Sequence, residues 1–355
     1  MYLCRYCEEC LITTFNIENR DEPKVLNNIG DKDYLNSILQ CLINTKNLRD
    51  YFLETYKTTP NKKLANEFHE LALNLWVKNI KENSYSPKAF KQVLNEIKPL
   101  SENNLVHEPK DLINSLLEIL DQELKEVIDN NNQIQQIPDP TDRILTLNLF
   151  LNEFYNSPIS KLFFCILKKE YLCKECQTKN YSFQLYKTFD FPLEEVNKYF
   201  NKKGEKPLKL PNNKNPNINL NECFEYIQNN DGNGQQQYCN KCNKLSNELH
   251  SKQLYKASNY IIISLNRGIN SNYECNVDFP EQLNLYKFFS SKDSNTYFEL
   301  YGVISQLNKD IVAFIKNDSD NEWYLYNDSK VTQCSKNYQY KEGLTHILFY
   351  QVLTN

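Results

Sequence analysis

The sequence predicts an α+β fold, in which a helical N-terminal part precedes a sheet-rich remainder. Apolar residues recur at helical spacing up to about Ile128, whereas aromatic and β-branched residues dominate the segments after Ile144. With 355 residues, of which 40% are hydrophobic, the chain is long enough to bury a sizeable core. Helices and strands that are segregated along a chain are typical of α+β architectures.

The helical part begins with apolar residues spaced three and four positions apart over residues 33–53. The same spacing predicts helices over residues 64–80, 87–97 and 111–128. Residues 130–142, NNNQIQQIPDPTD, are polar and contain proline, which predicts a surface loop.

The sheet-rich part contains aromatic and β-branched runs, which favour strands. These runs are YSFQLYKTFDFPL, YIIISLN, YFELYGVIS, IVAFIK, EWYLYN and ILFYQVL. Residues 201–219 are rich in Lys, Asn and Pro, and residues 228–237 contain NNDGNGQQQ. We expect both segments to be loops.

Charge and hydropathy argue against nucleic-acid and membrane partners. The formal net charge is -4, with 41 basic against 45 acidic residues, so no strong positive field attracts nucleic acid. No run of about 18 apolar residues occurs, which excludes a membrane-spanning helix. The N-terminal MYLCRYCEEC places charges where a signal peptide needs apolar residues. We therefore expect an intracellular protein, either cytoplasmic or nuclear.

Two C-x-x-C pairs, Cys173-Lys-Glu-Cys176 and Cys239-Asn-Lys-Cys242, predict a metal site. Each pair places two thiolates on one tight turn, and two such turns complete a tetrahedral shell for structural Zn2+. The alternative is an exposed pair that holds no metal. A similar spacing near the N-terminus belongs to Cys4, Cys7 and Cys10. Those three lack a fourth ligand nearby, so we expect no complete zinc module there.

Residues 28–42, NIGDKDYLNSILQCL, resemble the cysteine box of the ubiquitin-specific proteases, which reads roughly N-L-G-N-T-C-Y-M-N-S-x-L-Q-C-L. The resemblance continues in order through LRDYFL, NEFHELALNLW, the two cysteine pairs, DFPLEE, YIIISLNRG, YGVIS, WYLYNDSKV and ILFYQVL. The chain is thus identified as a member of this family of papain-like ubiquitin carboxyl-terminal hydrolases (peptidase family C19) that lacks the catalytic Cys and His.

The resemblance implies how the chain is organised. Residues 25–355 are expected to form one ubiquitin-specific protease-like domain, preceded by an N-terminal segment, residues 1–24, that is expected to be truncated or loosely ordered. Within the domain, the family has a helical thumb, here about residues 25–145. Zinc-ribbon fingers follow at about residues 160–255, and a β-rich palm at about residues 256–355. The implied cofactor is structural Zn2+, and the implied partner is ubiquitin or a ubiquitin-like protein.

The residues at the family's catalytic positions differ from the family pattern. Asp33 stands at the position of the nucleophilic Cys, and Asp310 stands at that of the general-base His. Asn28, at the position that polarises the oxyanion, and Asn327, at the third catalytic position, are retained. A carboxylate is a poor nucleophile toward an amide, so the resemblance implies a protein without thiol-protease activity. Asp33 also suits the N-cap of the helix that follows it.

Under two alternatives, the protein would be an active hydrolase. In the first, a residue at another position replaces the missing nucleophile or base. The candidates are Cys41 as the nucleophile and His346 as the base, although Cys41 matches a core position of the family. The other is an acid–base pair formed by Asp33 and Asp310, two carboxylates that share a proton or hold a cation.

The family's channel for the ubiquitin tail corresponds to three residues here. Glu108 and Asp111 keep the acidic positions of the family's Q-Q-D-A-x-E-F box, and Lys309 replaces a channel-lining Gly. We therefore expect an inactive, zinc-stabilised relative that acts as a scaffold or regulator by binding. A splicing-associated scaffold is a further alternative, because some members of that group share the NNI…DY…N pattern.

Overall fold

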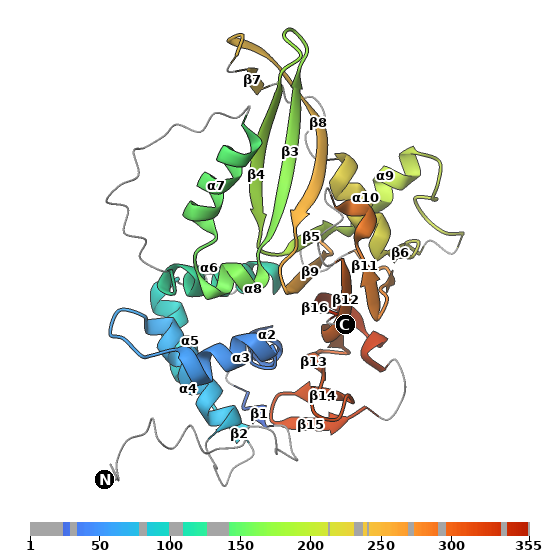
Figure 1. Ribbon diagram of the computed structural model, residues 1–355. Coiled ribbons are helices and arrows are strands. Elements are labelled where there is room, and N and C mark those ends of the chain that lie inside the picture. The colour runs from blue at the N-terminus through green and yellow to red at the C-terminus, as the bar shows by residue number, and fades with distance from the viewer. Residues whose placement is uncertain are drawn as a thin grey trace. The chain divides into compact units, whose positions relative to one another are not determined.

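The structure is a computed structural model of the whole chain (Figure 1). It describes residues 24–28, 34–77, 84–98, 109–125, 142–211, 214–230, 237–239, 241–268, 273–289, 296–334 and 339–353. The chain divides into two compact units. Unit 1 contains Met1–His107 and Ile304–Gly343, and unit 2 contains Glu108–Val303 and Leu344–Asn355.

Unit 1 combines a group of helices with antiparallel strands and one short parallel strand pair. Its helices are α2 (Tyr34–Ile43), α3 (Lys46–Asp50), the π-helix η1 (Tyr51–Thr55), α4 (Lys63–Trp76), α5 (Lys88–Ile97) and the short η4 (Gln339–Lys341). Its strands are β1 (Val25–Leu26), β2 (Ser84–Tyr85), β13 (Asp310–Lys316), β14 (Trp323–Asn327) and β15 (Lys330–Gln333). Strands β1 and β2 pair in parallel, and β13, β14 and β15 follow one another in antiparallel order.

Helix α2 is the centre of unit 1, because all ten of its residues are buried. The hydroxyl of Ser37 donates a hydrogen bond of 3.3 Å to the carbonyl of Ile311, which joins α2 to β13. The turn from β14 to β15 contains Asp328, whose φ is 48°, a left-handed conformation that Asp tolerates in tight turns. The start of β13 and the turn after β14 therefore lie beside the start of α2.

Unit 2 contains a four-stranded sheet, ordered β4-β3-β8-β7, which we call the cysteine-bearing sheet. Its strands are β3 (Cys165–Cys173), β4 (Lys179–Tyr186), β7 (Gln237–Cys239) and β8 (Lys244–Lys256). Figure 1 shows β3, β4 and β8 as long strands and β7 as a short one, with α7 lying along β4. The rings of Phe150 on α7 and Phe183 on β4 are 6.1 Å apart, so aromatic packing joins the two.

A second set of strands in unit 2 includes the largely buried strands β9 and β16. The strands are β5 (Phe189–Pro192), β9 (Tyr260–Asn266), β11 (Gln282–Asn284) and β16 (Leu344–Val352), with the short pair β6 (Ile218–Asn219) and β10 (Val277–Asp278). Strand β9 is buried except for Asn266, and it pairs in parallel with β5 and antiparallel with β16. Strand β12 (Tyr297–Leu307) pairs with β11 and leads the chain from unit 2 into unit 1.

The described residues of unit 2 also form five α-helices and the short η3. They are α6 (Pro109–Glu123), α7 (Arg143–Phe154), α8 (Pro158–Phe163), α9 (Leu193–Lys202), α10 (Leu220–Asn230) and η3 (Tyr286–Phe288). Among the residues that the structure describes, no helix is both long enough and apolar enough to cross a membrane.

Most predicted elements occur where the sequence places them, but the predicted change to strands at Ile144 is wrong. Helices α7 and α8 continue the helical part to Phe163, and α9 and α10 lie farther along the chain. Capping residues at their N-termini explain why α7 and α8 form. The carboxylate of Asp142 accepts from the amides of Ile144 and Leu145, and Ser157 forms a capping box at α8. Most of the loop predicted at residues 130–142 lies outside the described residues.

The two helix caps differ in burial, and this difference predicts how much each cap contributes to the free energy of unfolding. Ser157 is fully buried and also donates a hydrogen bond to the buried carboxylate of Asp121, whereas Asp142 is exposed. We expect Ser157→Ala to lower the free energy of unfolding by about 2–3 kcal/mol, because it removes the cap and a partner of a buried charge. Asp142→Ala, the exposed control, is expected to cost about 1 kcal/mol. Urea unfolding followed by circular dichroism measures both, and equal losses would contradict this account.

Candidate functional site

The four cysteines of the two predicted pairs meet at one end of the cysteine-bearing sheet. The sulfur atoms of Cys173, Cys176, Cys239 and Cys242 all lie within 4.8 Å of one another. The Cys173–Cys242 and Cys176–Cys239 sulfur distances are both 3.6 Å. Four thiolates bound at about 2.3 Å around a tetrahedral Zn2+ lie about 3.8 Å apart. The cluster therefore has the dimensions of a closed four-sulfur metal site with no position left for substrate.

Both cysteine turns have the same backbone geometry. The residue after each pair, Gln177 or Asn243, has a left-handed φ of 55° or 56°. The amide of Gln177 donates to the carbonyl of Cys173 over 3.0 Å, and that of Asn243 donates to the carbonyl of Cys239 over 2.8 Å. This repeated turn directs two sulfurs from each hairpin to the same point, which is how separate chain segments complete one metal shell.

A second polar group lies in unit 1, at the ends of β13 and β14. Asn327 Nδ2 donates a hydrogen bond of 3.3 Å to Asp310 Oδ2. These are the residues that the resemblance places at the third catalytic position and at the general-base position. The side chains are in contact, as a catalytic pair must be, but the group that faces Asn327 is a carboxylate and not an imidazole.

Asp328 joins this group, although the sequence analysis assigned it no role. Its carboxylate accepts from Asn28 Nδ2 over 2.9 Å and from Asn36 Nδ2 over 3.3 Å. Asn36 also donates to the carbonyl of Asn27 over 3.0 Å. The amide that the resemblance assigns to the oxyanion therefore donates to a carboxylate of the protein itself. The position of Asp328 directly after Asn327, in a two-residue turn, was the only signal in the sequence.

The described part of this group can orient and hydrogen-bond a ligand, but it offers no thiolate. Asp33 lies outside the described residues, and α2 begins directly after it at Tyr34. Cys41 is fully buried on α2, and this burial raises the pKa of its thiol well above the usual range. A buried, protonated thiol is a poor nucleophile, so Cys41 has the properties of a core residue.

His346, the other residue considered as a replacement, is a buried side chain of β16 in unit 2. It is 2% exposed. Burial, and secondarily the positive charge of Arg267, lower its pKa to about 4. The imidazole is therefore neutral near pH 7, and its low basicity makes it a poor general base.

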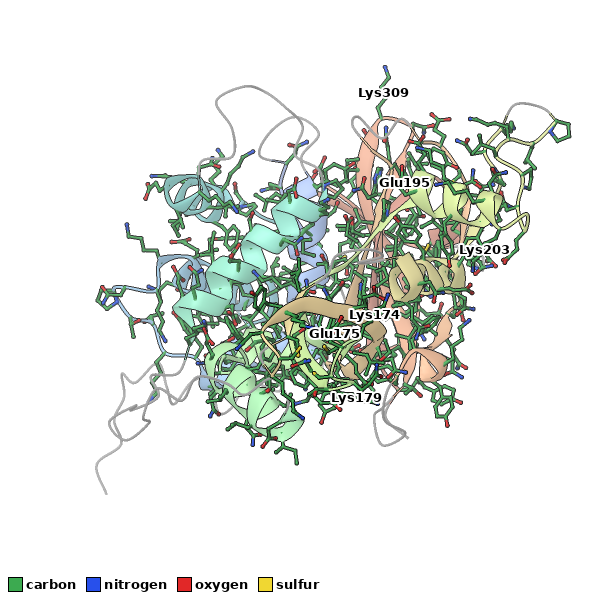
Figure 2. All side chains as sticks on the ribbon, turned by 90° about the horizontal axis from the view of Figure 1, so that it is seen from above. Lys174, Glu175, Lys179, Glu195, Lys203 and Lys309 are labelled. Atoms are coloured by element: carbon green, nitrogen blue, oxygen red, sulfur yellow. The ribbon has the colours of Figure 1, made fainter. Side chains whose placement is uncertain are left out.

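The three residues of the expected tail channel are only partly described. Glu108 lies outside the described residues. Asp111 is exposed in the first turn of α6 in unit 2. Lys309 is exposed in unit 1, in the turn before β13, where the preceding Asn308 has a φ of 56°. Figure 2 shows the Lys309 side chain extending away from the protein.

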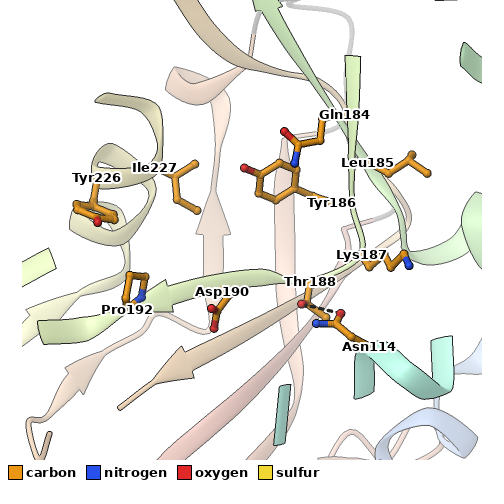
Figure 3. Close-up of a pocket in the computed structure, with 10 residues that line it drawn as sticks. All are labelled: Asn114, Gln184, Leu185, Tyr186, Lys187, Thr188, Asp190, Pro192, Tyr226 and Ile227. Carbon is orange, nitrogen blue, oxygen red and sulfur yellow. Dashed lines mark hydrogen bonds between the residues drawn. The ribbon is translucent and has the colours of Figure 1, made fainter. Parts of the chain in front are cut away.

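Unit 2 also has a hollow of about 570 Å3 beside α6. Its lining includes Asn114, Gln184, Leu185, Tyr186, Lys187, Thr188, Asp190, Pro192, Tyr226 and Ile227. Figure 3 shows Gln184 and Tyr186 directed toward Tyr226 on α10, with Leu185 on the other side of the strand. Thr188 donates to Asn114 over 3.0 Å at its base. Amide, hydroxyl and aromatic groups together suit a polypeptide segment.

The comparisons agree with the resemblance found in the sequence. A family profile described as "Ubiquitin carboxyl-terminal hydrolase" matches residues 25–350. Ubiquitin carboxyl-terminal hydrolase 2 of Bos taurus is 23% identical over 362 residues, which cover 96% of this chain and 56% of the relative. Ubiquitin carboxyl-terminal hydrolase 21 of Homo sapiens is 23% identical over 368 residues, covering 92% and 61%. The chain thus spans little more than half the length of these relatives.

A solved structure shares the fold. The SAGA DUB module of Ubp8, Sgf11, Sus1 and Sgf73 bound to monoubiquitin matches with a TM-score of 0.62 and 18% sequence identity. The match covers 95% of this chain and 70% of the chain in that structure. The predicted α+β class with the ubiquitin-specific protease fold is confirmed.

The lowered pKa of His346 predicts how stability depends on pH. In the unfolded chain its pKa is near 6.5, whereas in the folded protein it is about 4. Below pH 6.5 the unfolded state therefore binds the extra proton, and stability falls as the pH drops toward 4 by at most about 3 kcal/mol. We expect His346→Phe to remove this part of the pH dependence in urea unfolding measured at a series of pH values. A variant that keeps the slope of the parent would contradict the assignment.

Proposed function

The chain belongs to the ubiquitin carboxyl-terminal hydrolase family, and from this membership we propose that it is a member without hydrolase chemistry that binds ubiquitin or a ubiquitin-like protein. The observation that carries the proposal is the hydrogen bond of Asn327 to Asp310. A carboxylate at the position of the base has no N–H to orient and is a much weaker base than imidazole near neutral pH.

The replacement of the nucleophile supports the same conclusion. A thiolate attacks an amide carbonyl readily, whereas Asp33 presents a weakly nucleophilic carboxylate at the matching position. Thiol catalysis also needs an imidazole beside the thiol, so loss of both members removes both halves of the proton transfer. The Asn28 amide is engaged by Asp328 at 2.9 Å, which adds a negative charge where the family stabilises an oxyanion. Each of these changes disfavours the tetrahedral intermediate.

Binding is supported by the retained body of the domain. The family match extends over residues 25–350, and the SAGA structure that shares the fold holds monoubiquitin. Asp111 is exposed on α6, where its charge is available to a basic segment of a partner. The hollow beside α6 adds hydrogen-bonding side chains to the same unit. A protein-binding surface therefore persists without a nucleophile to act on the bound partner.

We further propose that Cys173, Cys176, Cys239 and Cys242 hold a structural Zn2+. The sulfur separations of 3.6 Å match a tetrahedral site, and the four ligands come from two hairpins far apart in sequence. When bound, the ion cross-links these hairpins and supplies folding free energy, without taking part in a reaction.

Hydrolysis of a fluorogenic ubiquitin C-terminal amide tests the missing chemistry. We expect no turnover above that of Asp33→Ala. Asp33→Cys alone restores nothing, because Asp310 cannot act as the imidazole does. The triple variant Asp33→Cys, Asp310→His, Lys309→Gly regains trace activity. Turnover that Asp33→Ala abolishes would instead establish an active hydrolase, and strong activity from the single Cys variant would show that the base is assigned wrongly.

A binding measurement must accompany the hydrolysis assay, because the absence of turnover alone does not demonstrate that the protein binds ubiquitin. Calorimetric titration with ubiquitin is expected to give saturable binding that Asp111→Lys weakens about tenfold, since a positive charge then faces the basic tail. Glu153→Lys, a matched reversal at an exposed position of α7, should leave the affinity unchanged. Saturable binding that ignores Asp111 would place the contact elsewhere, and no binding would exclude ubiquitin as the partner.

Metal analysis tests the zinc site. We expect about one Zn2+ per chain, and we expect Cys173→Ser to lose the metal and lower the melting temperature, because three ligands no longer close the shell. Cys334→Ser, which removes a partly exposed thiol of unit 1, serves as the control and should keep the metal. A parent with well under one zinc per chain, or a Cys173→Ser protein as stable as the parent, would contradict the assignment.

A further inference from the structure

We propose that helix α9 positions the aromatic contact residue of the hollow beside α6, so that Tyr199 of α9 acts through Tyr226 of α10 when a polypeptide partner binds. This inference rests on the proposed function, because it names a side chain of the hollow that a bound ubiquitin or ubiquitin-like protein contacts. Tyr199 is thus assigned as a positioning residue, and Tyr226 as the residue that touches the partner.

Tyr226 belongs to the part of the hollow that α10 contributes. Tyr226 and Ile227 both line the hollow, and Figure 3 shows them across from Gln184 and Tyr186. Tyr226 is half-buried, so the protein covers part of its side chain and leaves part open to a partner. Tyrosine is among the residues that contribute most to binding at protein interfaces. It contributes most when its side chain is already held in place, because less conformational freedom is then lost on binding.

The ring of Tyr199 on α9 packs edge-to-face against the ring of Tyr226. The ring centres are 5.7 Å apart and the ring planes are inclined by 82°, a geometry that aromatic pairs prefer. Figure 1 shows α9 beside α10, and both helices belong to unit 2. Tyr199 is not one of the described residues that line the hollow, so its effect on a partner must pass through Tyr226.

Lys203, at the C-terminal end of α9, connects Tyr199 to α10. Its ammonium lies 4.4 Å from the centre of the Tyr199 ring. The same ammonium is 3.1 Å from Oε1 of Glu225, the residue before Tyr226 on α10. Tyr199 and, secondarily, Glu225 raise the pKa of Lys203 above its usual range, so this ammonium stays charged at neutral pH. A partly exposed ion pair contributes little stability by itself, so we assign Lys203 the role of restricting the motion of Tyr199.

A second ion pair joins the segment after α9 to α10. Lys206 Nζ is 2.7 Å from Oε2 of Glu222, and the two side chains are only 15% and 19% exposed. Glu222 lies three residues before Glu225 and four before Tyr226, so the three positions share one face of α10. The contact with α9 therefore extends along a full turn of α10 and is not limited to one ring.

The core holds the backbone of α10 but does not hold the Tyr226 side chain. Phe224 is 3% exposed, and its ring centre lies 5.0 Å from that of Phe191 and 5.2 Å from that of Phe189, both on β5. Residues two apart on a helix point in different directions, so the Phe224 packing does not fix the Tyr226 ring. The contact with Tyr199 does.

A double-mutant cycle with the full chain and ubiquitin, measured by calorimetric titration, tests the inference. We expect Tyr226→Ala to weaken binding at least about tenfold, as loss of a contact residue does. Tyr199→Ala should weaken it about fivefold, because the ring of Tyr226 is then no longer held. The double variant Tyr199→Ala, Tyr226→Ala should bind as weakly as Tyr226→Ala alone, because Tyr199 acts only through Tyr226.

Two further variants control the cycle. Tyr199→Phe keeps the edge-to-face ring pair and should bind within about twofold of the parent. Tyr297→Ala removes a tyrosine of unit 2 that is 55% exposed on β12, and should leave the affinity unchanged. Fluorine NMR of chains labelled with fluorotyrosine reports on Tyr226 without a partner, since Tyr226→Phe identifies its resonance. Tyr199→Ala should shift that resonance, whereas Tyr199→Phe should not.

Several results would overturn this inference while leaving the proposed function intact. They are ubiquitin binding that Tyr226→Ala or Tyr199→Ala leaves unchanged, and losses that add in the double variant, as expected of a merely structural Tyr199. A Tyr226 resonance that Tyr199→Ala does not move would overturn it as well. A parent that binds no ubiquitin would overturn the proposed function, and with it the role of Tyr226 in binding.

Discussion

The functional interpretation depends on the polarity of one hydrogen bond, in which Asn327 donates to Asp310. A catalytic imidazole would donate its own N–H to the carbonyl oxygen of the asparagine. A carboxylate has no hydrogen to give, so it must accept from the amide nitrogen instead. Asparagine carries both a donor and an acceptor on one side chain, and it can satisfy either partner. Position 327 can therefore keep its residue while position 310 loses its chemistry.

Hydrogen bonds between side chains also satisfy the rest of the polar group in unit 1. Asp328 is held by the amides of Asn28 and Asn36, so its charge is stabilised without a cation. Helix α2, which carries Asn36, is buried along its whole length and bonded to β13 through Ser37. The carboxylates thus lie beside a buried helix that is hydrogen-bonded to the neighbouring strand. Catalytic residues are often costly to stability, and replacing them at fixed backbone geometry leaves such a fold intact.

Local sequence patterns predicted most of the fold, but they did not predict hydrogen bonds between side chains far apart in the sequence. The spacing of Cys173 and Cys176 indicated the metal cluster because both ligands lie on one turn. The change from helices to strands was placed too early, at Ile144, because the dense apolar pattern that follows does not by itself indicate a helix, whereas the cap at Asp142 does. Asp328 was missed for a different reason. Its partner Asn28 lies 300 residues away, and no local pattern reports such a contact.

The loss of turnover that we propose would change the effect of tight binding on the protein's action. A hydrolase must release its product, so strong ground-state binding slows it once substrate is abundant. A binding protein has no such constraint, and a slow dissociation rate prolongs the complex. On the proposed function, the protein therefore acts by holding its partner rather than by cutting it.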